Sequence, residues 1–447
     1  MISKRTAIHL IAGTILVGLA TSGPAMAQNI VIHAGTLIDG ISDVPKSNMS
    51  ILIKNDRVDS VAAGFVTPEG YQVVDMSSRT VLPGFIDCHV HVRGWRPVPD
   101  TGPLSTLDTA MSMTVNARRI LDAGFTTVRN VGAAGGVDVA LKRAIDSGVV
   151  EGPRMWVALE IIGPTNGHGD PRNGKAPDGY FDPEVIGRSV ADGPDEVRAV
   201  VRNHERRGAT VIKIAPSGGV NSVNDDPHKM LMTDEEIKAA VDTAHALGLK
   251  VAAHAQGTDA INHSIQLGVD TIEHATYADD VSIKLFKQYG TYLVPTILVG
   301  VQLLESLARD PSIRSPQSAA KARDAAKYKR SMVAKAYAAG VNIAFGTDTG
   351  EGRNAREFGL MADAGMKPMD IIKSATSVAA KLIGDEKDIG SIQPGRYADI
   401  VAVTGDPIAD IHTLEHVDYV MKGGRVVREG TRLSQPPAVA ASVDDKK

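Results

Sequence analysis

The chain has 447 residues and a formal net charge of −4, with 43% hydrophobic and 22% charged residues. This composition is that of a globular protein, and it excludes a disordered chain, a collagen-like chain and a membrane protein with many spans. The small negative charge gives no basic surplus to neutralise phosphates, so nucleic acid is not an expected partner. The single cysteine, Cys88, excludes an internal disulfide framework.

Residues 1–27 have the pattern of a secretory signal peptide. Lys4 and Arg5 supply the positive start, an apolar stretch follows, and small residues precede a cleavage site after Ala27. The apolar stretch is short for a membrane span, so we expect no stable membrane anchor after cleavage; an uncleaved anchor is the competing interpretation. The pattern therefore predicts a periplasmic or secreted protein.

Short runs of β-forming residues around turns occur at both ends of the remaining chain. These runs are 30–38, 50–53, 72–74, 398–403 and 419–427. We therefore expect residues 28–82 and 388–433 to build one small β-rich domain together. Residues 434–447 show no periodicity and are predicted to be a disordered tail.

The middle of the chain, residues 83–387, alternates short apolar runs with helical patterns, which is typical of βα units and a parallel sheet. The strand candidates are 82–92, 126–131, 155–162, 210–215, 250–255, 271–275, 292–297 and 342–347. Eight strands close a TIM barrel, so the sequence predicts an α/β fold with a (β/α)₈ barrel. Residues 298–340 are long for one crossover, and extra helix is expected there. Residues 163–186 are rich in Gly, Pro, Asp and Asn and are predicted to form a functional loop.

The strongest local pattern is His89-Val90-His91, which lies in the first strand candidate of the barrel. Alternate side chains of a strand point to the same face, so the two imidazoles can hold one metal ion together. A His-x-His pair also occurs by chance at surfaces and in cores, and alone it leaves that alternative open.

Further ionisable residues interrupt or end later strand candidates, where apolar residues are expected. They are Lys213, His254, His274 and Asp348. Active sites of barrels lie at the carboxyl ends of the strands, so these groups can converge with the two histidines. The alternative is a set of unrelated buried polar contacts, which loses weight with each residue added.

Lys213 requires a separate explanation, because an ammonium group beside metal cations would be repelled. Burial lowers the pKa of a lysine and exposes a nucleophilic amine, to which carbon dioxide can add to form a carbamate. The carbamate is anionic, and its two oxygens can bridge two metal ions. An ion pair with a carboxylate across the barrel is the alternative.

The motifs together resemble the amidohydrolase superfamily, in its binuclear, carboxylated-lysine subtype. The matching pieces are 83–91, Lys213, His254-Ala255, Glu273-His274-Ala275 and Gly346-Thr347-Asp348. The resemblance implies a distorted (β/α)₈ TIM barrel with a small β-sandwich domain from both termini, and two divalent metal ions, with zinc the expected identity. It also implies a role for each ligand: His89 and His91 bind the more buried ion, His254 and His274 the other, carbamylated Lys213 bridges them, and Asp348 binds the first ion and shuttles the proton.

Within that superfamily, residues 165–170, 213–219 and 253–257 resemble bacterial Xaa-Pro dipeptidase-like and ochratoxin-hydrolysing amidohydrolases. This resemblance implies that His168 stabilises the oxyanion or binds the substrate carboxylate; a hydrogen bond that orders the loop is the alternative. His228, in the loop after the bridging lysine, is a second candidate substrate contact. Relatives often carry a tyrosine in that loop and often form homo-oligomers; this loop has no tyrosine, and a homo-oligomer is expected.

The expected function is hydrolysis of an amide or peptide bond in a small molecule, such as a dipeptide, an N-acyl amino acid or an ochratoxin-like conjugate. A hydroxide that bridges the two metal ions would attack the carbonyl carbon, and Asp348 would accept the proton and pass it to the leaving nitrogen. Hydrolysis of a lactone, a cyclic amide or a carbamate on the same centre is one alternative. A non-catalytic metal-binding barrel protein is an alternative of a different class.

Overall fold

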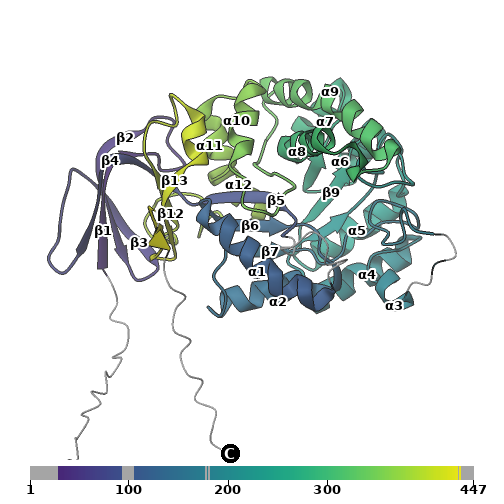
Figure 1. Ribbon diagram of the computed structural model, residues 1–447, viewed down its shortest axis with the longest axis horizontal. Helices are drawn as coiled ribbons and strands as arrows, with labels where there is room; N and C mark the ends of the chain where they lie inside the picture. Colours follow the sequence, from purple (N-terminus) through teal and green to yellow (C-terminus); the bar gives the residue numbers. More distant parts are fainter. Residues whose placement is uncertain (1–28, 93–104, 177–178, 180–181, 431, 434–447) are drawn as a thin grey trace, which may run out of the picture.

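The computed structural model describes residues 29–92, 105–176, 179, 182–430 and 432–433. The predicted signal peptide and the predicted disordered tail lie outside the described residues. The described chain forms a barrel surrounded by helices, with a β-sheet at its side (Figure 1). In these ranges no helix is long and apolar enough to cross a membrane.

Both ends of the chain contribute to one eight-stranded sheet, in the order β15-β14-β13-β12-β4-β1-β2-β3. The strands are β1 (Asn29–Leu37), β2 (Lys46–Lys54), β3 (Arg57–Ala63), β4 (Gln72–Pro83), β12 (Ile400–Val403), β13 (Val417–Lys422), β14 (Arg425–Glu429) and β15 (Arg432–Leu433). The neighbours β1 and β4 are parallel, and the other neighbours are antiparallel. In Figure 1 the purple N-terminal strands lie beside the yellow C-terminal strands.

The sheet curls until its outer strand β3 meets the chain that leads into β12. Arg57 pairs with Tyr397, and the N–H of Val58 donates to the carbonyl of Arg396. The curled sheet encloses its own core, which includes Ile32 and Met421. The expected β domain from both termini is thus confirmed, and its layers come from one curled sheet.

Seven parallel strands form most of the barrel wall. Three pair in one sheet, β5 (Phe85–Val90), β6 (Phe125–Asn130) and β7 (Arg154–Val157), and four in another, β8 (Ile212–Ile214), β9 (Val251–Ala255), β10 (Thr271–His274) and β11 (Tyr292–Val294). A parallel bridge between Ile162 and Ile214 joins the two sheets after β7.

Residues 342–349 occupy the eighth position of the barrel, between β11 and β5. A parallel bridge joins Leu293 to Ile343 on one side, and another joins Val90 to Thr349 on the other. The expected TIM barrel is therefore confirmed, although its eighth strand is irregular: no strand is assigned to 342–347 in the described chain.

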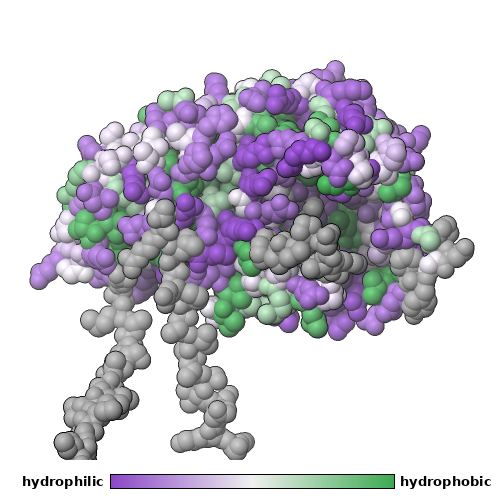
Figure 2. Space-filling view, in the orientation of Figure 1, coloured by the Kyte–Doolittle hydropathy of each residue, from purple (hydrophilic) through white to green (hydrophobic). Residues whose placement is uncertain are grey.

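Helices cover the outside of the barrel (Figure 1). They are α1 (Thr106–Asp122), α2 (Val137–Asp146), α3 (Pro183–Ile186), α4 (Pro194–Arg207), α5 (Asp234–Ala246), α6 (Thr258–Gln266), α7 (Asp280–Tyr289), α8 (Ile297–Arg309), α9 (Pro316–Ala338), α10 (Arg356–Asp363), α11 (Pro368–Ser374) and α12 (Ser377–Ile383). The extra helix expected after β11 is present as α8 and α9. Figure 2 shows a mostly hydrophilic face with small apolar patches, because the large apolar cluster lies between strands and helices.

Candidate active site

All six predicted metal ligands line one cavity at the carboxyl end of the barrel. The cavity has a volume of about 520 Å³, and its walls include His89, His91, His168, Lys213, His254, His274 and Asp348. These side chains come from β5 and the residue that follows it, from β8, β9 and β10, from the segment after β7 and from the segment in the place of an eighth strand. The structure thus brings together the residues that the sequence placed on separate strands.

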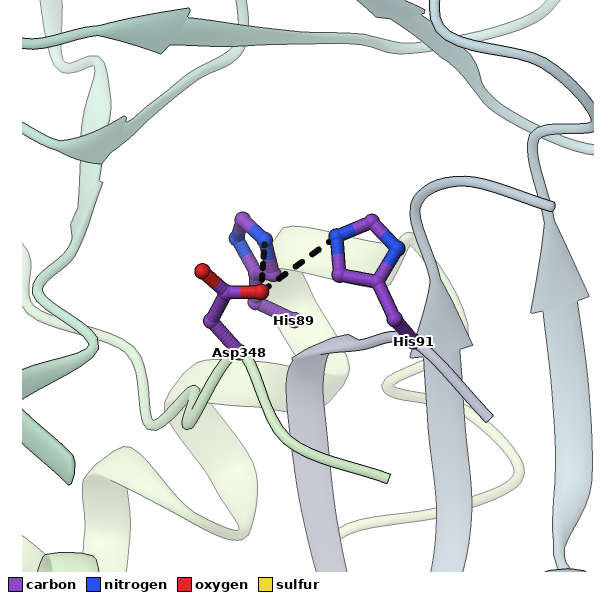
Figure 3. Close-up of side chains that lie close together, drawn as sticks. All are labelled: His89, His91 and Asp348. Carbon is purple, nitrogen blue, oxygen red and sulfur yellow. Dashed lines mark ion pairs between the residues drawn. The ribbon is translucent and has the colours of Figure 1, made fainter. Parts of the chain in front are cut away.

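His89, His91 and Asp348 form the tightest group in the cavity (Figure 3). The Oδ1 atom of Asp348 lies 3.6 Å from Nε2 of His89 and 3.4 Å from Nε2 of His91. The three ligand atoms all lie within 4.8 Å of one another. This spacing is suitable for one metal ion bound by two imidazoles and a carboxylate.

The other ring nitrogen of each of these histidines is held by an acceptor. Nδ1 of His89 donates to Glu273 at 2.6 Å, and Nδ1 of His91 donates to the carbonyl of Gly132 at 2.9 Å. A proton fixed on Nδ1 leaves the lone pair on Nε2, and in both rings Nε2 is the atom that faces Asp348. The tautomers required for metal binding are therefore set by the surrounding protein.

His254 and His274 form a second group beside the first. Their ring centroids lie 4.6 Å apart, and the His274 ring lies 5.0 Å from the ring of His89. Nε2 of His254 donates to the carbonyl of Gly218 at 3.2 Å, and Nδ1 of His274 lies 2.7 Å from the hydroxyl oxygen of Thr296. The other nitrogen of each ring is left to bind a second metal ion.

His89, His254 and His274 are neutral at neutral pH. Burial, together with the positive charge of Lys213, lowers the pKa of His89 to about 4. Burial and the neighbouring cationic groups lower the pKa values of His254 and His274 well below the usual range. Neutral imidazole is the form that binds metal ions, so no proton has to be removed when an ion binds.

Lys213 lies among these rings with only 1% of its surface exposed. Its Nζ atom is buried and has no hydrogen-bond partner among the described residues. Burial lowers the pKa of this amine to about 8. No carboxylate of the described chain lies within ion-pair distance of it, so the alternative of an ion pair across the barrel does not explain this lysine.

Several residues of the site have a left-handed backbone, which is unfavourable for residues other than glycine. The φ angle is 73° at His274, 56° at Asp348 and 52° at Thr296, whose side chain contacts the His274 ring. Such conformations cost about 1–3 kcal/mol each and persist where the surrounding structure imposes them. The strain is concentrated at the strand ends that carry the candidate ligands.

A buried ion pair, to which the sequence patterns assign no role, lies beneath the first group. Arg129 of β6 lies 2.7 Å from Oε1 of Glu273, whose other oxygen contacts His89. Burial opposes ionisation of Glu273, but the charge of Arg129 and the hydrogen bond from His89 outweigh it and hold the pKa of this carboxyl well below its usual range. Arg129 and Glu273 are both ionisable residues inside a buried strand, which is the same signal that singled out Lys213.

Asp87 is a second buried carboxylate whose role the sequence did not reveal. It accepts hydrogen bonds from the hydroxyl of Thr347, the amide of Asn354 and the backbone N–H of His89. Burial raises its pKa to about 7. These bonds tie β5 to the chain immediately before Asp348, so they fix the spacing of the two sides of the first group.

His168 is placed in the cavity wall by its neighbours. Its ring is stacked on His254 with 4.1 Å between centroids, and Nδ1 lies 3.1 Å from the hydroxyl oxygen of Ser222. Ser222 in turn donates to Asp225. A Cβ atom at Gly219 would lie 2.1 Å from Nδ1 of His168, so only glycine leaves room for the ring.

His228 does not line this cavity in the described chain. Its ring lies 4.0 Å from the ring of Tyr277, and Nε2 lies 3.8 Å from Oδ2 of Asp324. Its contact with substrate therefore stays a prediction.

Cys88 is buried and contacts the carbonyl of Ala379 on α12, so it points away from the cavity, as its place on the strand indicates.

A smaller, mostly apolar cavity of about 110 Å³ adjoins the first. Its apolar walls come from α8 and α9 and include Val299, Leu303, Leu304, Ala322 and Ala325. The two cavities share His168, His254, His274 and Asp348 as lining residues. An apolar space that opens onto a polar centre is the usual form of a small-molecule site.

A TIM barrel with imidazoles, a carboxylate and a buried lysine at the carboxyl ends of its strands has the arrangement of a hydrolase that uses metal ions. Residues 80–427 match the model of the amidohydrolase family. The chain therefore belongs to the amidohydrolase family, whose members are generally metal-dependent.

Comparisons with known proteins agree with this assignment. The chain is 31% identical to ochratoxinase from Aspergillus niger over 432 residues, which cover 90% of this chain and 87% of that protein. It matches the crystal structure of a Xaa-Pro dipeptidase with methionine bound in the active site, with a TM-score of 0.85 and 40% identity, over 90% of this chain and all of the other. A prolidase complexed with N-methylphosphonate-L-proline gives a TM-score of 0.81 at 31% identity, over 90% of this chain and all of that one. These similarities confirm the resemblance seen in the sequence, and the protein is a hydrolase that acts on carbon–nitrogen bonds.

Proposed function

We propose that the protein hydrolyses the amide or peptide bond of a dipeptide, an N-acyl amino acid or a related conjugate, and that it does so with two divalent metal ions. The observation that carries this proposal is the buried Nζ atom of Lys213, which has no partner among the described residues and belongs to a side chain that lines the same cavity as two pairs of histidines. A carbamate formed on this amine would supply the anionic oxygens that a two-ion site requires.

The side chains that line the cavity fit a pair of divalent metal ions. His89, His91 and Asp348 would hold one ion, His254 and His274 the other, and carbamylated Lys213 both. Imidazole and carboxylate ligands suit zinc, and they also suit manganese and cobalt. When bound, such ions lower the pKa of a shared water molecule and polarise the carbonyl group of the substrate.

Asp348 is the residue that we expect to move the proton. Its N–H donates to the carbonyl of His89 at 2.7 Å, so the carboxylate is fixed beside the first group of ligands. From that place it can accept a proton as the nucleophile forms and give it to the leaving nitrogen. Proton transfer at the nitrogen makes departure of the amine possible.

His168 is the candidate for stabilising the negative charge that develops on the carbonyl oxygen. It lines both cavities, and burial lowers its pKa to about 4. In the tautomer with its proton on Nε2, the hydroxyl of Ser222 donates to Nδ1 in place of Asp225, and the neutral ring presents an N–H on its other nitrogen. Donors that are fixed before the reaction stabilise such charge without reorganisation.

Ochratoxinase and the Xaa-Pro dipeptidase support an amide or peptide bond as the target. The test is a panel of N-acyl amino acids and of Xaa-Pro, Xaa-Phe and Xaa-Arg dipeptides, assayed on metal-loaded protein beside lactones, cyclic amides and carbamates. We expect turnover to be highest on the first set. Preferred turnover of lactones or carbamates would replace the amide assignment, and absence of both bound metal and turnover would favour a non-catalytic barrel.

We further propose that the protein acts outside the cytoplasm, on the evidence of the signal-like pattern in residues 1–27. N-terminal sequencing of the protein from a bacterial periplasm should give a chain that begins at Gln28. An intact N-terminus in the cytoplasmic fraction would contradict export.

A further inference from the structure

One amine projects into the apolar cavity beside the candidate metal centre. Lys329 of α9 is half-buried and lines this cavity. Its Nζ atom donates to the backbone carbonyl of His274 at 3.0 Å. No carboxylate of the described chain lies within ion-pair distance of this amine, whereas Arg330, which lines the same cavity, pairs with Asp363 at 3.1 Å.

The position of this amine is costly without an anionic partner. An ammonium group has three N–H donors, and His274 accepts only one of them. The structure therefore leaves two donors for a group that is not part of the described protein.

We propose that Lys329 binds the free carboxylate of the amine half of the substrate, while the apolar walls of the same cavity hold that residue's side chain. This inference rests on the proposed function and narrows its substrate class to N-acyl amino acids and dipeptides with a free C-terminal carboxylate and an apolar C-terminal residue. Amides and esters of the same compounds would be poor substrates.

The geometry of such a substrate fits the distance between the candidate metal centre and Lys329. Three covalent bonds separate the carbon of the scissile carbonyl from the carbon of the carboxylate, which is a span of roughly 3 to 4 Å. His274 is a candidate ligand, and its own backbone carbonyl holds the amine. A carbonyl group at the metal centre would thus place the carboxylate near Lys329.

The walls of the cavity select the side chain of that residue. Val299 and Leu303 of α8 face Ala322 and Ala325 of α9 across a space of about 110 Å³. A branched aliphatic side chain can fill such a space, whereas a charged side chain would lose its hydration there without a partner. Lys329 and the apolar walls therefore recognise, respectively, the carboxylate and the apolar side chain of the same amino acid.

The experiment compares N-acetyl-L-leucine with N-acetyl-L-leucinamide on the metal-loaded wild type and on Lys329→Met, Lys329→Arg and Lys327→Met. We expect the wild type to prefer the acid by roughly tenfold to a hundredfold in kcat/KM, since hydrogen bonds to charged groups carry that much. Lys329→Met should remove this preference, mainly through KM, and leave turnover of the amide nearly unchanged. Lys329→Arg should restore part of it.

Lys327→Met is the matched control, because Lys327 lies on the same helix and pairs with Asp324 at the surface. It should behave as the wild type. Metal content is measured for every variant, so that a disturbance of His274 is recognised. An equal loss on acid and amide in Lys329→Met would overturn the inference, because a merely structural role does not depend on the charge of the substrate.

Failure of the proposed function is a separate outcome. If the wild type hydrolyses no compound of the panel, the affinities of N-acetyl-L-leucine and N-acetyl-L-leucinamide are measured by calorimetry on the metal-loaded proteins. Tighter binding of the acid that Lys329→Met abolishes would support the inference even then. Equal affinities in the wild type and in Lys329→Met would overturn it.

Discussion

The Nδ1 atom of His89 lies 2.6 Å from Oε2 of Glu273, and the two side chains are 1% and 0% exposed. The glutamate is held in turn by Arg129, 2.7 Å from its other oxygen. A carboxylate on the outer nitrogen of a metal-binding imidazole fixes the tautomer and the orientation of the ring. Glu273 therefore prepares His89 for metal binding although it does not itself line the cavity in the described chain.

We predict that Glu273→Gln weakens metal binding by roughly tenfold to a hundredfold, the range known for partners of metal-bound histidines. The amide keeps the shape of the side chain but loses the charge that holds the proton on Nδ1 of His89. Competition with a chromophoric chelator measures this affinity directly.

Glu415→Gln is the control for this variant. Glu415 contacts Nδ1 of His412 at 2.7 Å in the same manner, but this histidine lies at the surface and away from the cavity. It should leave metal affinity unchanged. Glu273→Gln also leaves Arg129 buried without its partner, so urea unfolding of the metal-free proteins is needed to separate stability from affinity. Unchanged metal affinity in a folded Glu273→Gln protein would show that the glutamate does not prepare His89.

We predict that Asp348→Asn retains bound metal but loses at least about a hundredfold in kcat, because an amide cannot accept and return a proton. Metal analysis and steady-state kinetics on the same preparation give both numbers. Asp234→Asn serves as control, since Asp234 contacts His263 at 2.7 Å on the surface. Near-normal turnover in Asp348→Asn would remove Asp348 from proton transfer.

We predict that Lys213→Met lowers the metal content below two ions per chain and abolishes turnover, because the bridging anion is lost. For the wild type, removal of metal with a chelator followed by reloading should restore activity more completely with bicarbonate than in buffer freed of carbon dioxide. The physical reason is that carbon dioxide has to add to the neutral amine, and burial already lowers the pKa of Lys213 to about 8.

The matched control is Lys422→Met. Burial lowers the pKa of Lys422 to about 8 as well, but its Nζ atom donates to the carbonyl of Gly152 at 2.6 Å, far from the cavity. This variant should keep the full metal content. Reloading that is independent of bicarbonate, with two ions still bound in Lys213→Met, would refute the carbamate.

The fold could be predicted from the sequence wherever a short apolar run coincides with a barrel strand. Periodicity misplaced the bounds of several strands, for instance at the carboxyl ends of β7 and β11, and two further places show why. The single strand expected at 82–92 is divided in the structure into the end of β4 and the strand β5, with Gly84 between them. A glycine does not interrupt an apolar pattern, so the apolar run contains no sign of this division. The candidate 342–347 is irregular: it includes Gly346, where a Cβ atom would lie 2.2 Å from Val294, and it leads into Asp348, which has a positive φ. Neither the break nor the strain leaves a trace in an apolar pattern.

The candidate ligands could be predicted because each lies in or just after a strand candidate, and the topology of a barrel brings the carboxyl ends of its strands together. The pairing of residues across the barrel and the roles of residues on helices could not be predicted. Glu273 and Arg129 become partners only through the closure of the ring. Lys329 lies on a helix outside the barrel and differs in no local pattern from the exposed lysines beside it. Their roles depend on distances that sequence spacing does not contain.

The stability of the β domain should depend on pH through Asp39, which follows β1. Its carboxylate accepts hydrogen bonds from the backbone N–H groups of Ile41 and Ser42 and from the ammonium of Lys46. Burial opposes ionisation of this carboxyl, but these donors outweigh it and lower its pKa to about 2 from the usual 3.8. The ionised form is thus favoured by folding. Its stabilising contribution is fully present above pH 3.8 and is lost as the pH falls toward 2.

We predict that Asp39→Asn lowers the free energy of unfolding by about 1 kcal/mol at pH 7, a value reduced for solvent screening of the exposed lysine, and by less at pH 3. Urea unfolding of both proteins at the two pH values measures this difference. A loss that is the same at both would mean that the hydrogen bonds, and not the charge, stabilise this turn.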